Sequence, residues 1–244
     1  MSIHNKIICL LLLIITFSSC KTLNLNKVEL VLYETGELGI RKDNILEYYS
    51  INNNEVKRKG NIQFNLPIGT DEISNGALGP LIIRNDTILK YYKSSKNELI
   101  EIQDTKFHLP KNVNQIEMPI TGYLMIRINN ELRFYNAPKE SEFKEDIGFR
   151  YTLPAGTDEI AMNGTLLCIR NNSELKFYKV SNKEYNEIKE MRVKFPYKID
   201  EIILSDKRTL VIRTGLILKF YKRPNTLENS FKEIKEMEFK IQQN

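Results

Sequence analysis

The sequence predicts an all-β protein, a five-bladed β-propeller built from five four-stranded repeats of about 43 residues. Three observations support this prediction. A Leu-x-Ile-Arg motif recurs five times at a constant interval, a turn and a second apolar segment follow each copy, and the repeats fill most of the 244-residue chain.

The repeat stays in phase from one end of the chain to the other. Each motif ends in an arginine, and successive arginines are 43 residues apart: Arg41, Arg84, Arg127, Arg170 and Arg213. The same interval relates five tyrosines further along each unit, which are Tyr49, Tyr92, Tyr135, Tyr178 and Tyr221. Five copies in phase indicate one supersecondary unit that packs against copies of itself.

Each unit carries signals for four short strands, and the second unit shows them well. A first strand opens at 71–73, a second covers 81–84, a third covers 88–92 and a fourth closes at 107–110. Asp86-Thr87 separates the second and third strands, and the equivalent turns of the other units mostly hold Asp, Asn or Gly. These residues tolerate the positive φ that two-residue hairpins require.

The predicted domain covers residues 28–244, with units at about 28–70, 71–113, 114–157, 158–199 and 200–244. The second strand is apolar on both faces, as in Leu81-Ile82-Ile83. A strand of this kind is typical of a sheet packed between neighbouring sheets. The pattern therefore favours stacked blades in a closed ring over the alternative, an open β-solenoid.

The N-terminal segment has the pattern of a signal peptide. Lys6 precedes the apolar run 7–17, which is too short to cross a bilayer because a spanning helix needs about 20 residues. The exit, Phe17-Ser18-Ser19-Cys20, resembles the lipobox of bacterial lipoproteins, with Phe17 where Leu is commoner. The resemblance implies that residues 1–19 are a signal peptide that is removed, that Cys20 is the lipid attachment site, and that 20–27 form a short tether. The alternative is a simple secretory signal with an incidental cysteine.

Composition argues against several kinds of function. The formal charge of +5 is spread through the chain, so we expect no nucleic-acid partner. After processing, the chain keeps His108, Cys20 and Cys168, too few residues for a zinc site, and a catalytic triad would have to use His108. Cys168 lies in an apolar segment and is expected to be a free, buried thiol. The near-identical units present no unique pair of acids, so the sequence predicts no enzyme, cofactor or metal. A hydrolase that uses acids in the mouth of the ring is an alternative that ranks below the two binding functions described next.

The repeated arginines have two interpretations. Antiparallel pairing places Glu72 opposite Arg84 and, equivalently, Glu29 opposite Arg41, which predicts structural cross-strand ion pairs. Under the second interpretation the arginines line a binding face for an anionic group. Unit three has Gln115 where the other units have Glu, so Arg127 would then have the least compensated charge. The candidate binding residues are Arg127, Arg41, Arg84, Arg170 and Arg213. For the repeated tyrosines, packing between blades is favoured over a sugar-stacking surface.

These features predict a non-enzymatic lipoprotein of the cell envelope that is anchored by its N-terminal lipid, in the outer membrane if the organism has one. Its domain would face the periplasm or the cell surface. We expect it to bind a protein, either as an assembly scaffold or as an immunity protein that neutralises a toxin or effector. The alternative is a glycan-binding lipoprotein at the cell surface, where five weak sites would add their affinities.

Overall fold

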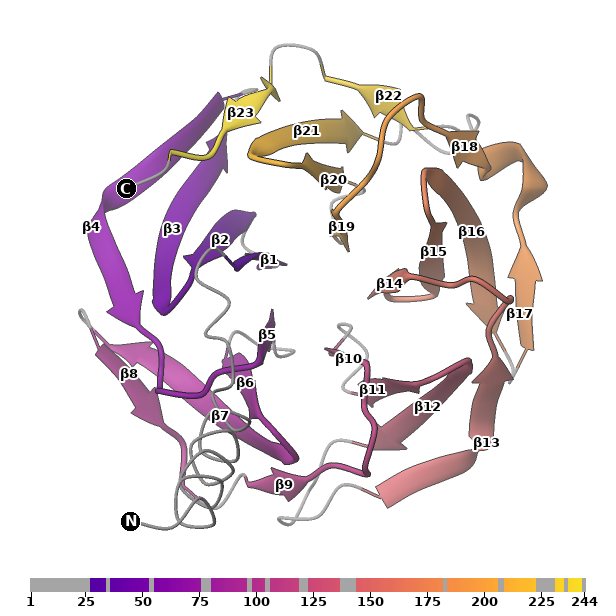
Figure 1. Ribbon diagram of the computed structural model, residues 1–244, viewed down its shortest axis with the longest axis horizontal. Helices are drawn as coiled ribbons and strands as arrows, with labels where there is room; N and C mark the ends of the chain where they lie inside the picture. The colour runs from indigo at the N-terminus through magenta and orange to yellow at the C-terminus, as the bar shows by residue number, and fades with distance from the viewer. Residues whose placement is uncertain are drawn as a thin grey trace, which may run out of the picture.

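The computed structural model describes residues 27–33, 36–52, 55–75, 80–95, 98–103, 106–118, 123–136, 144–181, 184–205, 209–222, 231–234 and 237–242. Five small antiparallel sheets stand in a ring, which confirms the predicted five-bladed β-propeller (Figure 1). The predicted signal peptide, Cys20 and most of the predicted tether lie outside the described residues. In the described ranges, no helix has the length and apolar character needed to cross a membrane.

The five sheets follow one another along the chain, and we number the blades in that order. Blade one contains β1 (Val28–Leu32), β2 (Glu37–Lys42), β3 (Ile45–Asn52) and β4 (Glu55–Asn65). Blade two contains β5 (Glu72–Asn75), β6 (Leu81–Asn85), β7 (Ile88–Ser95), β8 (Glu98–Glu101) and β9 (Phe107–His108). Blade three contains β10 (Gln115–Glu117), β11 (Tyr123–Ile128), β12 (Glu131–Asn136) and β13 (Lys144–Thr152). Blade four contains β14 (Glu159–Asn163), β15 (Leu166–Asn171), β16 (Glu174–Ser181), β17 (Glu184–Glu187), the 3₁₀ helix η1 (Lys189–Met191) and β18 (Val193–Lys194). Blade five contains β19 (Glu201–Leu204), β20 (Thr209–Thr214), β21 (Ile217–Lys222), β22 (Lys232–Glu233) and β23 (Phe239–Lys240).

Each blade is an up-and-down meander whose first strand lies nearest the ring axis and whose last strand lies outermost (Figure 1). In blades two, four and five the outermost strand consists of two short pieces that both pair with the third strand. In blades one and three it is continuous, and the register shifts once, between Glu47 and Tyr49 in β3 and between Arg133 and Tyr135 in β12.

The hairpins between the second and third strands all turn in the same way. The first turn residue has positive φ in every blade: Asp43 (54°), Asp86 (55°), Asn129 (54°), Asn172 (54°) and Gly215 (58°). Asp, Asn and Gly adopt this conformation at the lowest cost, so the turn residues of the sequence set the hairpin geometry. The segments that link one blade to the next end beside these turns. We call this side of the ring the hairpin face.

The hydrophobic core lies between the blades, as the doubly apolar second strands predicted. Leu81, Ile82 and Ile83 are at most 2% exposed, and they divide between the cores on the two sides of blade two. Another core joins the two ends of the chain, where Leu30 and Leu38 of blade one pack with Phe220 of blade five. Because the first and last blades share a core, the ring is closed and is not an open solenoid.

Two side-chain predictions concern this core. Cys168 is free and fully buried, as expected. The repeated tyrosines are also buried, each 5–7% exposed, in the cores between blades. Four of them donate their hydroxyl hydrogens to glutamates of their own blade: Tyr49 to Glu47, Tyr92 to Glu101, Tyr135 to Glu145 and Tyr221 to Glu233. These contacts support packing rather than an exposed sugar-stacking surface.

Candidate functional site: the central channel

A cavity of about 430 Å³ lies on the axis of the ring, and the first strands of all five blades line it. Because these strands run away from the hairpin face, their starts lie at the hairpin end of the channel and their ends at the other mouth. Asn114, Asp158 and Asp200 line the hairpin end, while Tyr33, Met118, Met162, Asn163 and Ser205 line the far end. The channel wall between them is rich in acidic side chains.

A repeated glutamate links each first strand to the next blade. Glu29 Oε1 accepts the backbone N–H of Ile73 (3.0 Å), and Glu72 Oε1 accepts that of Ile116 (2.9 Å). Glu159 does the same for Ile202 (3.1 Å). First strands leave their channel-side N–H groups without a strand partner, so each carboxylate satisfies a donor that would otherwise need water.

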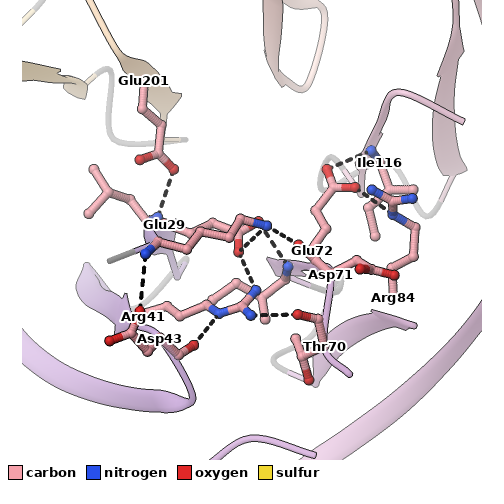
Figure 2. A network of polar contacts seen from close by, with 12 residues as sticks. Glu29, Arg41, Asp43, Thr70, Asp71, Glu72, Arg84, Ile116 and Glu201 are labelled. Carbon is pink, nitrogen blue, oxygen red and sulfur yellow. Dashed lines mark hydrogen bonds and ion pairs between the residues drawn. The ribbon is translucent and has the colours of Figure 1, made fainter. Parts of the chain in front are cut away.

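The same contact closes the ring. Glu201 Oε1 in the last blade accepts the backbone N–H of Leu30 in the first (2.7 Å), and Figure 2 shows this carboxylate reaching across the blade boundary. The two blades share no sheet, since each is built only from its own consecutive strands. Among the described residues, closure rests on this hydrogen bond, on a longer one from Lys42 Nζ to the carbonyl of Gln242 (3.4 Å), and on the shared core.

The repeated arginines pair with these glutamates, as the predicted register required. The strands pair Glu29 with Arg41 and Glu72 with Arg84, and the same pattern recurs as Glu159–Arg170 and Glu201–Arg213. The arginine nitrogens lie 2.7–2.8 Å from the carboxylate oxygens. Figure 2 shows two of these pairs, and it also shows Arg41 reaching the backbone carbonyl of Thr70 in the linker to blade two.

Blade three departs from the pattern, as its sequence indicated. Gln115 replaces the glutamate and makes two bonds to the next blade: its Oε1 accepts the N–H of Ile160 (3.0 Å), and its Nε2 donates to the carbonyl of the same residue (2.7 Å). Arg127 instead donates to backbone carbonyls of Asn129, Asp158 and Thr157. It is 9% exposed, and burial lowers its pKa, with nearby Asp158 opposing that effect. Arg127 and Arg170 line the channel, whereas the other three repeated arginines do not.

Glu117 on β10 is a second departure, which reasoning from the sequence missed. The equivalent positions of the other blades hold Val31, Ser74, Ala161 and Ile203. Among the described residues, Glu117 is the one acid lining the channel without an ion-pair partner within 4 Å. Within the described part of the chain, its carboxyl group has one hydrogen bond, a long one of 3.5 Å from Gln115 Nε2.

The concentration of carboxylates in the wall changes their acidity. Burial raises the pKa of Glu117 well above that of an ordinary glutamate, and the negative charges of Glu72, Glu159, Glu201 and Glu29 raise it further. Burial also raises the pKa of Glu72 to about 7, although Arg84 opposes the change. The pKa values of Glu159 and Glu201 are raised for the same main reason.

The described residues contain no group of three or more His, Cys, Asp or Glu side chains placed to hold a metal ion. His108 and Cys168 do not line the channel. Burial raises the pKa of the Cys168 thiol well above its usual value, with Glu159 adding to the effect, so the reactive thiolate form is disfavoured.

Comparison with known proteins gives no family. The chain matches no protein-family model and no curated protein. Among solved structures, it is similar to a protein from Lactobacillus plantarum (13% identity, TM-score 0.44), covering 84% of this chain and 69% of that one. It is also similar to a functionally unknown protein from Desulfotomaculum acetoxidans (12% identity, TM-score 0.49), and the match covers 85% of this chain and 68% of that one. Hsv2 from Kluyveromyces lactis (10% identity, TM-score 0.43) is covered over 63% of its length by 85% of this chain. Likeness at this level says nothing about function.

Proposed function

We propose that this protein is a lipid-anchored envelope lipoprotein whose propeller binds a partner protein without catalysing a reaction. The observation that carries the proposal is the place where the chain enters the ring. The Lys27 backbone N–H donates to Asp43 Oδ1 (3.1 Å), and the Lys27 carbonyl accepts the N–H of Asp43 (3.0 Å). Lys27 also donates through Nζ to the backbone carbonyl of Asp71. These bonds fix the start of the first strand at the hairpin face.

The entry point gives an anchored ring a defined orientation. A tether of eight residues from Cys20 to Lys27 extends at most about 28 Å. A lipid on Cys20 would therefore hold the hairpin face toward the membrane and leave the opposite face free. The repeated glutamates and arginines are already used in bonds within and between blades, so the ring acts as a rigid frame and recognition falls to its free face. The glycan alternative gains nothing from the repeated tyrosines, which are buried.

Two matched cysteine variants test the proposal, one on the face opposite the hairpins and one on the hairpin face. Asn136 and Asn130 are both exposed in blade three, with Asn130 in the hairpin turn and Asn136 at the opposite end of β12. Each is changed to cysteine and labelled in intact envelopes with a photoactivatable maleimide, a reagent that does not reach buried Cys168.

We expect a discrete cross-linked protein from Asn136→Cys and none from Asn130→Cys. A cross-link from Asn130→Cys alone would contradict the orientation, and no cross-link from either would contradict protein binding. A Cys20→Ala variant tests the anchor separately, because it should leave the membrane fraction and lose labelling by a palmitate analogue. The lipoprotein assignment would be overturned if Cys20→Ala stayed in the membrane fraction and the wild-type protein took up no palmitate analogue.

A further inference from the structure

The channel wall holds one carboxylate whose charge nothing described in the structure neutralises. The other acids that line the channel have cationic partners: Glu29, Glu72, Glu159 and Glu201 pair with arginines, Asp158 lies 3.6 Å from Arg170, and Asp200 lies 3.2 Å from Lys198. Glu117 has no such partner in the described ranges, and it occurs in one blade only. The fold therefore does not need an acid at this position, since four blades close without one.

The same cavity also presents a buried acceptor to which no described residue donates. Asn75 donates through Nδ2 to the carbonyl of Leu32 (2.9 Å), while its Oδ1 atom is buried and accepts no hydrogen bond from the described residues. Leaving a buried acceptor unpaired costs free energy. Glu117 and Asn75 both lie toward the end of their strands that is remote from the hairpin face, so the unpaired acid and the unbonded amide oxygen belong to the same half of the channel.

The size of the whole cavity and the lining of this half suit a small organic group. A volume of about 430 Å³ falls in the range of small-molecule sites, roughly 300–1,000 Å³. Tyr33, Met118 and Met162, which have largely apolar side chains, line the same end of the channel. An aliphatic stem that ends in a charged nitrogen combines the two features, because it buries methylene groups while its head makes hydrogen bonds.

We propose that the central channel binds one organic cation, a primary ammonium or guanidinium group, with Glu117 as its counter-ion. The cation could come from a free amine or from a lysine or arginine side chain of a partner. The proposal does not rest on the lipid anchor or on the orientation of the ring.

A linked proton gives the site a signature. The charges of Glu72, Glu159, Glu201 and Glu29 act on Glu117. Among the described residues, the channel is also lined by Asp158, Asp200, Arg127 and Arg170, while Arg41, Arg84 and Arg213 pair with the wall glutamates from outside the lining. The acids and burial favour the protonated form of Glu117, whereas a bound cation favours its carboxylate. Cation binding near neutral pH should therefore release a proton.

Isothermal titration of the full-length chain in detergent tests the proposal, with butylamine and butylguanidine as probes and butyramide as the neutral control. We expect both cations to bind, butyramide not to bind, and Glu117→Gln to weaken cation binding at least tenfold. Glu131→Gln is the matched control, since this acid is exposed in the same blade and pairs with Arg133. Equal binding by the wild type and Glu117→Gln, or no binding of either cation, would overturn the proposal.

The wild-type chain gives a readout that does not depend on whether the variant folds. Titration in two buffers of different ionisation enthalpy should show a proton released on cation binding, and cation binding with no proton exchange would count against Glu117 as the counter-ion. Acetyl-Gly-Lys-Gly-amide separates the two sources of the cation. Binding comparable to that of butylamine assigns the site to a partner's side chain, and binding of butylamine alone assigns it to a free amine.

Discussion

Single residues in this ring show how a polar side chain can recur for structural reasons. The carboxylate of Glu72 bonds the N–H of the next blade through one oxygen and Arg84 through the other. Gln115 can supply the first of these contacts but carries no charge, and in the same blade Arg127 bonds carbonyls instead. The arginine thus keeps a role in joining blades even where its acid is missing.

Arg127→Ala should destabilise the protein markedly. Hydrogen bonds to charged groups contribute about 1.5–3 kcal/mol each, and the variant would leave carbonyls of Thr157 and Asp158 without this donor. We expect the free energy of unfolding in urea to fall by about 2–4 kcal/mol. Arg150→Ala is the control: its side chain is 40% exposed and pairs with Glu145, so its loss should cost less than about 1 kcal/mol. Equally small losses for both variants would show that Arg127 is not structural.

The sequence predicted pairing within a blade better than contacts between blades. Residues that face each other in a hairpin follow from the turn and the alternation of strand faces, so the pairing of Glu29 with Arg41 could be derived. The bond from Glu29 to Ile73 could not, because it depends on how two sheets are placed in space. Glu117 did carry a signal, an acid where other blades have Val, Ser, Ala or Ile, but a residue that occurs in one unit alone cannot be told from ordinary sequence drift without the channel geometry.

At the scale of elements, the first strands form a ring of side-chain-to-backbone bonds that replaces a shared sheet. β1 and β19 belong to different sheets, and Glu201 links them through the N–H of Leu30. The outer strands vary more, being continuous in blades one and three and interrupted in the others. The repeat predicted four strands in each unit, but the interruptions follow loops whose length and composition differ between units.

Glu201→Ala should weaken ring closure, whereas Glu201→Gln should largely preserve it. The alanine variant leaves Arg213 without its carboxylate and Leu30 without its acceptor, and loss of one partner of a buried pair costs about 3–5 kcal/mol. Glutamine keeps an oxygen that can accept the N–H of Leu30, as Gln115 does for Ile160. We therefore expect Glu201→Gln to lower the free energy of unfolding by less than half as much as Glu201→Ala.

Hydrogen exchange measured by mass spectrometry locates the effect of these two variants. Peptides that contain the Leu30 amide should exchange faster in Glu201→Ala than in Glu201→Gln. The Ile73 amide donates its hydrogen bond to Glu29 and provides the internal control, because its exchange rate should change much less. Equal exchange at Leu30 in the two variants would contradict a closing role for the Glu201 carboxylate.

At the scale of the whole molecule, closing five similar blades brings their acids together on one axis. A single blade would leave each carboxylate in water beside its arginine, but the ring removes that water and adds the charges of the other blades. This explains why the pKa of Glu72 rises to about 7 despite its bond to Arg84. The sequence predicted the ring and the acids, but the raised pKa values depend on closure and could not be derived from one unit.

Stability should therefore fall as the pH rises from 5.5 to 8.5. A glutamate whose pKa is higher in the folded state holds its proton more tightly there, so its favourable contribution is complete below the ordinary value of 4.5 and is lost as the pH passes about 7. Glu117, Glu159 and Glu201 change in the same direction. Burial alone would raise the pKa of Glu47, but hydrogen bonds from Lys42 and Tyr49 lower it. Glu47 therefore loses its stabilising contribution as the pH falls, and this loss occurs below the range from pH 5.5 to 8.5.

Thermal unfolding followed by circular dichroism checks this expectation. The midpoint should be several degrees lower at pH 8.5 than at pH 5.5, because a loss of 1 kcal/mol lowers the midpoint by about 2–4 °C in a protein of this size. Glu117→Gln should reduce the difference, since an amide remains neutral throughout, whereas Glu131→Gln on the exposed side of the same blade should leave it unchanged. A midpoint that stays constant or rises with pH would mean that the channel carboxylates are already charged at pH 5.5 and that their arginines compensate them fully.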